Sequence, residues 1–393
     1  MNETHKIFLD LVSSYLLNEK KEFSTKFDTQ MVQNLETFSS QNLCLPIICE
    51  AFVKNNIDIP EKWRSVSSFV VLDSFRKLTI ESEVLSIFEK SGIRACILKG
   101  STAAINYTNP LSRSLGDIDI LVDDYNYKKA SMLFVSQEEF ENNKHDFHIG
   151  FNYKNVRIEI HKYITDDYID RKEIRSAFDG ALDNIAIKTY ENYKIPALSD
   201  SHQAVSLLSH MTRHIRDNEF VFRMFLDWVC FVKKTPQNVW TQDVYPTLKL
   251  AGFHFFADAL NKTAAIYLKL DLSDKVCSAV NDEVCSLIIE EFLGGNRHSV
   301  SEPTNINLAA IMAKRRGQFK NKIGAFFDAI NFIARDKYAT ARHKLILPFF
   351  WVYIPVKYML NVILGKRKPL DFKAIEAVSE RKTKIFDATQ IRL

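Results

Sequence analysis

Two short segments alternate strictly between apolar and polar residues, and this alternation constrains the fold more than any other feature of the chain. The segments are DIDILV (117–122) and VRIEIH (156–161). Period-two alternation is typical of a β-strand that buries one face, because successive side chains point to opposite sides. In both segments the Ile and Val residues share one face and the carboxylates share the other. The pattern therefore predicts a sheet with an acidic face.

Further strands are expected around these two. The apolar run IRACIL (93–98) predicts a buried strand, and HDFHIGFNY (145–153) alternates again. Lys154-Asn155 is typical of a two-residue hairpin turn between that segment and VRIEIH. STAAINYT and YNYKKASMLFV (125–135) are expected to be short helices. This strand–helix–strand–helix–hairpin block predicts a small mixed sheet.

Helical patterns flank the block, with apolar residues three and four apart in IFLDLVSSYLL and again from Ser201 onward. The expected fold class is α+β, a small mixed sheet between helical regions. Four segments are predicted. They are a helical N-terminal region (1–90), a core (91–195), a helical C-terminal domain (196–340) and an apolar, basic C-terminal segment (341–393).

Composition excludes several classes of protein. With 46% hydrophobic and 25% charged residues the chain is an ordinary globular protein rather than a disordered one. The six cysteines form no C-x-x-C pair, which argues against a zinc or redox site and predicts buried free thiols. The first residues lack the pattern of a signal peptide, so the expected location is the cytoplasm.

Charge is unevenly distributed along the chain. The net charge is +4, yet residues 341–393 hold eleven Lys and Arg against four Asp and Glu, a balance of +7 that leaves about −3 for the rest. A basic tail suggests an anionic partner for that segment. The mildly acidic body argues against nucleic acid as a partner, since nucleic-acid binders usually carry a positive stripe.

Three carboxylates predict a metal site. Asp117 and Asp119 are two apart on a strand and share a face, where they repel each other unless a cation neutralises them. If the VRIEIH strand lies beside DIDILV, Glu159 completes the cluster. Three carboxylates suit a pair of divalent cations, which assist in-line phosphoryl chemistry.

The residues that follow the IRACIL run favour a phosphate ligand. Gly100 permits close approach of the backbone to a ligand, and Ser101 adds a hydroxyl at the start of the predicted helix. Lys99 and Arg113 are nearby cations in the sequence, and the arginine can bind a phosphate through two nitrogens.

These motifs together resemble a known superfamily. Gly-Ser, then Asp-x-Asp on a strand, then a third carboxylate on a later strand is similar to the polymerase-β nucleotidyltransferases. LKGSTAAINY…RSLGDIDILV…IEIH resembles more closely a bacterial group called uncharacterised nucleotidyltransferase family proteins. The close resemblance covers about residues 93 to 163. A weaker one continues through SHMTRHIR and FRMFLDWV.

The resemblance implies roles for particular residues. Asp117, Asp119 and Glu159 would be the catalytic metal ligands, for two Mg²⁺ ions or for Mn²⁺. Gly100 and Ser101 would bind the triphosphate, and the other nucleotide-binding candidates are Lys99, Arg113 and His161. A neutral imidazole at His161 could hydrogen-bond a carboxylate or a phosphate without ligating a metal. A role in the acceptor pocket would fall to His210, Arg223 and Asp227.

Other interpretations of these residues stay open. Arg223 and Asp227 are four apart, which equally fits an ion pair on a helix surface. The gap of fifteen residues between Ser101 and Asp117 is longer than usual for the superfamily. Its members also carry Asp more often than Glu as the third carboxylate.

The implied function is transfer of a nucleoside monophosphate from an NTP to a sugar, peptide, protein or other small-molecule acceptor. An alternative is a non-catalytic protein that binds a nucleotide or a partner on the same fold. A nucleic-acid polymerase or tRNA-modifying enzyme is disfavoured by the charge of the body.

The run LILPFFWVYIPVKYMLNVIL (345–364) is apolar over a length that matches a membrane span. Pro348, Pro355, Lys357 and Asn361 interrupt it, and basic residues flank both ends. Three interpretations of this run stay open: a buried helix that covers the body, an interfacial segment on an anionic membrane, or a true membrane span.

Overall fold

The structure is a computed structural model. It describes residues 1–23, 27–143, 147–164, 171–217, 220–294, 344–367, 369 and 371–391, with isolated residues between 324 and 338. These residues group into two compact units. Unit 1 comprises Met1–Thr212 with Val221–Ile289, and unit 2 comprises Arg213–Phe220 with Glu290–Leu393. The division of the chain into four segments stays a prediction.

Four helices open the chain, as the apolar periodicity predicts. They are α1 (Glu3–Leu17), α2 (Thr29–Gln41), α3 (Leu45–Lys54) and the long α4 (Glu61–Lys90). Asn2 and Asp28 cap the first two, because each side chain accepts a hydrogen bond from a backbone N–H of the first turn. Such caps satisfy amides that have no partner inside the helix.

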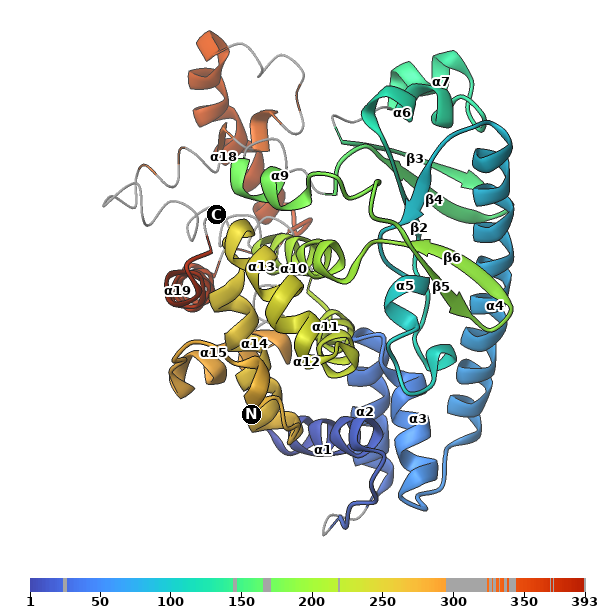
Figure 1. Ribbon diagram of the computed structural model, residues 1–393. Coiled ribbons are helices and arrows are strands. Elements are labelled where there is room, and N and C mark those ends of the chain that lie inside the picture. The colour runs from blue at the N-terminus through green and yellow to red at the C-terminus, as the bar shows by residue number, and fades with distance from the viewer. Residues whose placement is uncertain are drawn as a thin grey trace. The chain divides into compact units, whose positions relative to one another are not determined.

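A six-stranded mixed sheet follows (Figure 1), which confirms the predicted fold class. Its strands are β1 (Ala95–Ile97), β2 (Ile118–Val122), β3 (His148–Tyr153), β4 (Val156–His161), β5 (Ala186–Tyr190) and β6 (Tyr193–Ala197). Their order is β3-β4-β2-β1-β6-β5. The β2 and β4 strands are parallel, whereas β1 and β2 are antiparallel. The β5–β6 hairpin was not anticipated from the sequence.

The β3–β4 hairpin has the turn that the sequence predicts. Lys154 and Asn155 both have positive φ, 50° and 61°, as a two-residue turn of this kind requires. The pairing starts with Tyr153 opposite Val156 and ends with His148 opposite His161. Residues 145 and 146, at the start of the predicted strand, lie outside the described residues.

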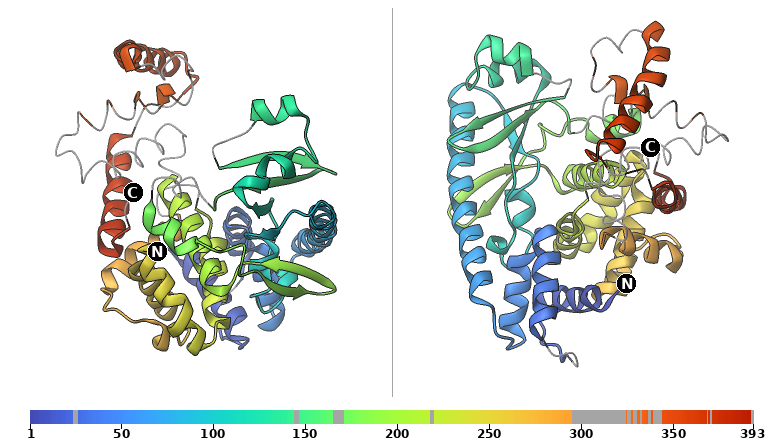
Figure 2. Two further views of the ribbon diagram at one scale, coloured as in Figure 1. Left: turned by 45° about the horizontal axis from the view of Figure 1, so that its top comes forward. Right: turned by 180° about the vertical axis from the view of Figure 1, so that it is seen from behind.

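The main core of the sheet lies between one of its faces and α4, which runs alongside the strands in Figures 1 and 2. The alternating Ile and Val residues of β2 and β4 supply most of the sheet side. Leu78, Val84 and Phe88 supply the α4 side. The helices α6 (Asp124–Ser131) and α7 (Gln137–Asn143) add Tyr127 and Phe140. Because this face is apolar, the acidic residues of β2 and β4 lie on the other face.

The rest of the described chain is helical. Short elements are α5 (Ser101–Ala104), η1 (Pro110–Ser112), α9 (Lys172–Phe178), α12 (Gln237–Val239), the π-helix η2 (Trp240–Val244) and η3 (Ser273–Lys275). The other helices are α10 (Asp200–Asp217), α11 (Phe222–Lys234), the seven-residue α13 (Tyr245–Ala251), α14 (His254–Leu268) and α15 (Asp282–Phe292). Gly252 separates α13 from α14, because its φ of 75° ends the first helix.

The six cysteines are free thiols, as predicted, but Cys277 is exposed rather than buried.

In unit 2, η5 (Lys344–Ile346) leads into α18 (Leu347–Ile363), and α19 (Phe372–Thr389) follows. Leu347 and Phe350 pack against Ile330 and Ala334, but most other apolar side chains of α18 are exposed. These side chains of α18 are therefore not buried within unit 2, and the alternative of a helix that covers the body stays a prediction. Within the part of the chain that is described, no helix combines the length and apolar character that a membrane span needs.

Candidate active site

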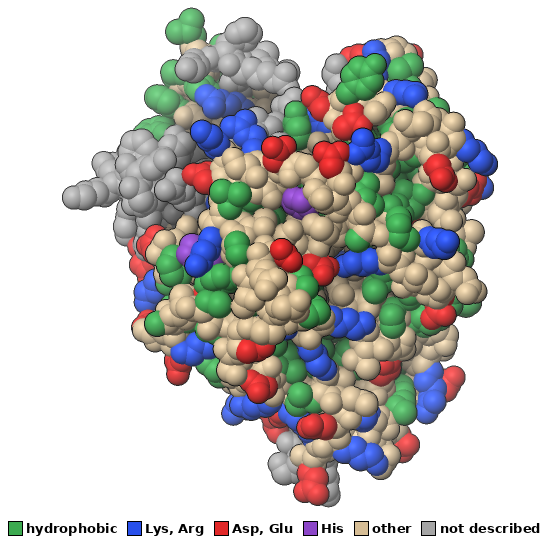
Figure 3. Space-filling view, viewed as in Figure 1, with side chains coloured by type: hydrophobic (Ala, Val, Ile, Leu, Met, Phe, Trp, Pro, Cys, Tyr) green, Lys and Arg blue, Asp and Glu red, His purple; other side chains and the backbone are tan. Residues whose placement is uncertain are grey.

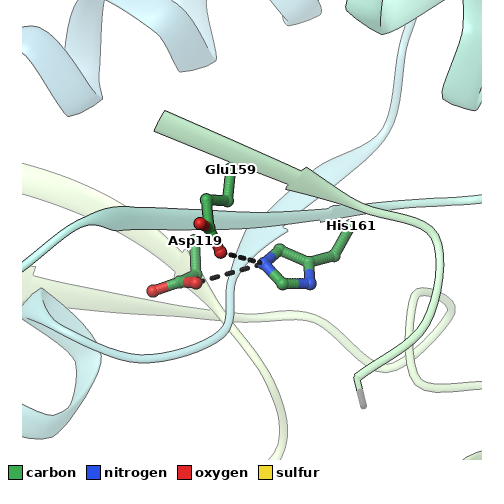
Figure 4. A group of neighbouring side chains, drawn as sticks. All are labelled: Asp119, Glu159 and His161. Carbon is green, nitrogen blue, oxygen red and sulfur yellow. Dashed lines mark hydrogen bonds and ion pairs between the residues drawn. The ribbon is translucent and has the colours of Figure 1, made fainter. Parts of the chain in front are cut away.

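The parallel pairing of β2 with β4 builds an acidic group on the face of the sheet opposite α4. Asp119 lies directly opposite Glu159 in the register, and both side chains point to the same side. His161, two residues beyond Glu159, joins them (Figure 4). The three residues can bring one ligand atom each to within 4.8 Å of the others, a spacing that suits a metal ion.

The imidazole of His161 lies between the two carboxylates. Its Nε2 is 3.1 Å from Asp119 Oδ1 and 3.4 Å from Glu159 Oε2. Lys99 approaches from β1, with Nζ 3.3 Å from Asp119 Oδ1. The structure therefore brings together residues from three adjacent strands or their ends, as the alternation of the two strands suggests.

Asp119 has an unusual environment for a carboxylate. Its side chain is 1% exposed, and among the described residues nothing donates a hydrogen bond to its Oδ2. An oxygen of a buried carboxylate that is left without a partner carries a large desolvation cost. A cation bound to Oδ2 would offset that cost, so the residues present fit a metal ion.

The charged neighbours shift the pKa values of the group. Burial alone would raise the pKa of Asp119, but Lys99 and His161 outweigh it and lower the pKa to about 2. The hydrogen bond from His161 lowers the pKa of Glu159. Burial would lower the pKa of His161, yet its contacts with both carboxylates raise it. The two carboxylates are thus ionised at neutral pH.

Asp117 lies just before β2, at the exposed edge of the group. Its pKa is raised by partial burial and then by the nearby charges of Asp119 and Glu159. The other two carboxylates therefore repel its negative charge, although Asp117 is not one of the three residues whose ligand atoms converge.

Gly100 and Ser101 lie beside the start of β2. Gly100 has a φ of 79°, and a Cβ there would lie 3.8 Å from the carbonyl oxygen of Asp117. Positive φ favours glycine at this turn. The Ser101 hydroxyl does not face the acidic group, because it donates to Glu81 of α4, 2.7 Å and 2.9 Å from the two carboxylate oxygens. Glu81 gave no signal in the sequence.

Arg113 occupies a different position from the one expected. It is buried, and its Nε and Nη2 each donate to a carboxylate oxygen of Asp227 at 2.7 Å. Tyr107 donates to the same carboxylate at 2.7 Å. This geometry makes Arg113 part of a buried ion pair between η1 and α11, rather than a free cation at the phosphate site.

The Arg223–Asp227 ion pair on a helix surface, an alternative from the sequence, is also not formed. Asp227 is buried and pairs with Arg113, while Arg223 donates to the carbonyl oxygen of Ser114 at 2.8 Å. Arg223 therefore stabilises the loop that leads to Asp117. His210, the third residue expected in the acceptor pocket, lies half-buried on α10 and makes contacts of its own.

The sequence patterns did not single out His148, which borders the acidic group. It faces Glu159 with Nε2 at 4.0 Å from Oε1, and its ring stacks on His161 with centroids 5.2 Å apart. Counting back from the Lys154-Asn155 turn would have placed it opposite His161. Arg157 also borders the group, since its Nε is 3.8 Å from Glu159 Oε1 and its guanidinium lies over Gly150.

Comparison with known proteins agrees with this geometry. A family model described as uncharacterised nucleotidyltransferase matches residues 39–268, which is more than half of the chain. No curated protein and no solved structure matches the chain.

Proposed function

Because the chain belongs to the family of uncharacterised nucleotidyltransferases, we propose that it transfers a nucleoside monophosphate from an NTP to an acceptor hydroxyl or similar group. One observation carries this proposal. Asp119 is a buried, ionised carboxylate with an oxygen that has no partner among the described residues, beside Glu159 and His161. A site of this kind fits the metal-assisted phosphoryl transfer that defines nucleotidyl transfer.

In this proposal Asp117, Asp119 and Glu159 hold divalent cations, two Mg²⁺ ions or Mn²⁺. Ions bound there would offset the charge of the triphosphate and of the leaving pyrophosphate. Lys99 contributes a further positive charge at 3.3 Å from Asp119. The positive φ of Gly100 lets the backbone of Gly100 and Ser101 approach the phosphates.

The reaction exchanges one phosphorus–oxygen bond for another. The acceptor oxygen forms a bond to the α-phosphorus, and the bond from that phosphorus to the oxygen shared with the β-phosphate breaks. Pyrophosphate leaves with the electron pair. We assign Glu159 to the acceptor side, where its partly exposed carboxylate takes the proton of the acceptor. His210 stays our candidate for the acceptor pocket, and the acceptor is a small molecule, a peptide or a protein.

The test is nucleotide binding by calorimetry and pyrophosphate release with each of ATP, GTP, CTP and UTP, in Mg²⁺ and in Mn²⁺. The Asp117→Asn/Asp119→Asn variant is compared with the wild type. Loss of several kcal/mol of charge stabilisation should lower pyrophosphate release by roughly 10²-fold or more. Asp124→Asn is the matched control, because Asp124 is exposed at the start of α6 and pairs only loosely with Lys162.

Two outcomes separate the hypotheses. Metal-dependent nucleotide binding without pyrophosphate release, over a broad set of acceptors, would favour a non-catalytic binder on this fold. No nucleotide binding with any metal would contradict both.

We also propose that α18 of unit 2 makes peripheral contact with an anionic membrane. Phe349, Val352, Val356, Met359 and Ile363 are 43% to 79% exposed and recur at spacings of three and four, so they form one apolar stripe. Figure 3 shows apolar and basic side chains side by side over this segment, at the top left. An apolar stripe with basic neighbours is typical of helices that lie in a membrane interface.

A further inference from the structure

The imidazole of His161 contacts both carboxylates through a single atom. Nε2 is 3.1 Å from Asp119 Oδ1 and 3.4 Å from Glu159 Oε2, and Figure 4 shows the ring directed at both. A ring nitrogen that carries one hydrogen can make only one well-directed hydrogen bond. Two carboxylates that converge on one nitrogen share either its proton or a cation bound in its place.

The two distances from Nε2 match the spacing of neighbouring ligands around one metal ion, and one ligand atom from each of the three residues lies within 4.8 Å of the others. Ligands bound at about 2.1 Å to one ion lie roughly 3.0–3.4 Å apart at the corners of an octahedron or tetrahedron. Both distances from Nε2 fall in this range. An ion coordinated by His161 and by the Asp119 carboxylate would also give a partner to Oδ2, which has none among the described residues.

The imidazole is also held in place. His161 is 6% exposed and ends β4, so its backbone is fixed by pairing with β2 and β3. The ring of His148 stacks on it at an angle of 21° between the planes. A ligand that is rigid before the metal arrives loses little entropy on binding.

We propose that His161 is a direct metal ligand and gives the site a preference for a first-row transition-metal ion over Mg²⁺. Mg²⁺ favours carboxylates, phosphates and water, whereas imidazole nitrogen suits transition metals. A donor set of one imidazole and two carboxylates therefore discriminates between the two classes of ion. This inference rests on the metal site of the proposed function, but it concerns the ion rather than the reaction.

The experiment measures the affinity of the full chain for metal ions in the absence of nucleotide. MnCl₂ and MgCl₂ are titrated by calorimetry into the wild type, His161→Gln and the control His254→Gln, whose residue lies on α14. We expect the wild type to bind Mn²⁺ at least about tenfold more tightly than Mg²⁺, because Mg²⁺ prefers oxygen ligands and gives up its water reluctantly. His161→Gln should lose about tenfold or more in Mn²⁺ affinity and much less in Mg²⁺ affinity. The control should match the wild type.

Pulsed electron paramagnetic resonance of bound Mn²⁺ gives a readout that needs no variant. Direct ligation predicts coupling from one imidazole nitrogen, which persists in His148→Gln and disappears in His161→Gln. Bound Mn²⁺ without nitrogen coupling in the wild type overturns the proposal, even if His161→Gln fails to fold. Equal affinity of the wild type for Mn²⁺ and Mg²⁺ overturns it as well.

Failure of this inference and failure of the proposed function are distinguishable. If bound Mn²⁺ shows only oxygen ligands and pyrophosphate release is normal, His161 is not a metal ligand and the proposed function stands. If bound Mn²⁺ shows nitrogen coupling but no NTP releases pyrophosphate, the metal site stands and the proposed transferase activity fails.

Discussion

At the scale of single residues, two buried carboxylates of unit 1 have opposite properties because their neighbours differ. Asp119 faces Lys99 and His161, and its pKa is lowered to about 2. Burial raises the pKa of Glu81 to about 8, since the hydroxyl of Ser101 only partly offsets the desolvation. Similar burial therefore produces one ionised and one largely protonated carboxyl group at neutral pH.

This contrast predicts how Glu81 affects stability. Its pKa is raised on folding from about 4.5, so the folded state holds the proton more tightly than the unfolded state does. The contribution is fully present below pH 4.5 and is lost as the pH rises towards 8. Glu81→Gln is neutral at every pH, so its melting temperature relative to the wild type should rise by a few degrees between pH 5 and pH 9.

Thermal unfolding followed by circular dichroism at each pH measures this effect. Glu89→Gln is the control, because Glu89 is exposed on the same helix. A difference between Glu81→Gln and the wild type that stays constant from pH 5 to pH 9 would show that Glu81 does not change its protonation on folding.

The sequence allows some of these residues to be placed and not others. Asp119 and Glu159 follow from alternation alone, because a period of two decides which face a side chain takes. Glu81 and Ser101 are twenty positions apart, and Arg113 and Asp227 are 114 apart. No local pattern encodes such contacts, so Arg113 could be expected at a phosphate when it is in fact held by an aspartate.

At the scale of elements, the Arg113–Asp227 ion pair joins η1, and the loop after it, to α11. Both side chains are buried, and each guanidinium–carboxylate distance is 2.7 Å. Asp227→Asn should cost roughly 3–5 kcal/mol of unfolding free energy, because it leaves the charge of Arg113 buried without a partner. Denaturation in urea measures the loss, with the exposed Asp243→Asn as control.

A double variant tests whether the cost comes from the unpaired charge. Arg113→Met/Asp227→Leu replaces both members by apolar side chains and should be more stable than Asp227→Asn alone. A double variant that loses the sum of the two single losses would mean that the residues act independently.

Element types were easier to predict than the extent of the sheet. The β3–β4 hairpin follows from its two-residue turn, whereas the β5–β6 hairpin adds two strands that the sequence did not indicate. Pro196 lies in β6 and Ile187, its partner in the register, is exposed, so the usual apolar alternation is weak there. Proline inside a segment argues against a strand, which explains the omission.

At the scale of the whole molecule, the family match and the basic tail fall on different parts of the chain. The matched residues 39–268 lie in unit 1 apart from 213–220, whereas α18 and α19 belong to unit 2. The excess of +7 over residues 341–393 is also outside the match. Attachment to a surface and chemistry would therefore be tasks of separate units.

Binding to vesicles tests this division of tasks. Wild-type protein should sediment with vesicles of phosphatidylglycerol and phosphatidylcholine, but weakly with phosphatidylcholine alone, and high salt should weaken the binding. Phe349→Ser/Ile363→Ser removes two exposed apolar side chains of α18. Because each is worth about 1.5 kcal/mol or more when buried, the variant should lose at least tenfold in binding.

Phe69→Ser/Leu72→Ser on α4 is the matched control, since these residues are 68% and 69% exposed but lie in unit 1. It should bind anionic vesicles as the wild type does, because neither residue belongs to the α18 stripe. Equal binding of the wild type to both kinds of vesicle would remove the role of the basic residues. If the wild type is a dimer without lipid and the α18 variant is a monomer, the stripe binds a second copy of the chain and the membrane proposal fails.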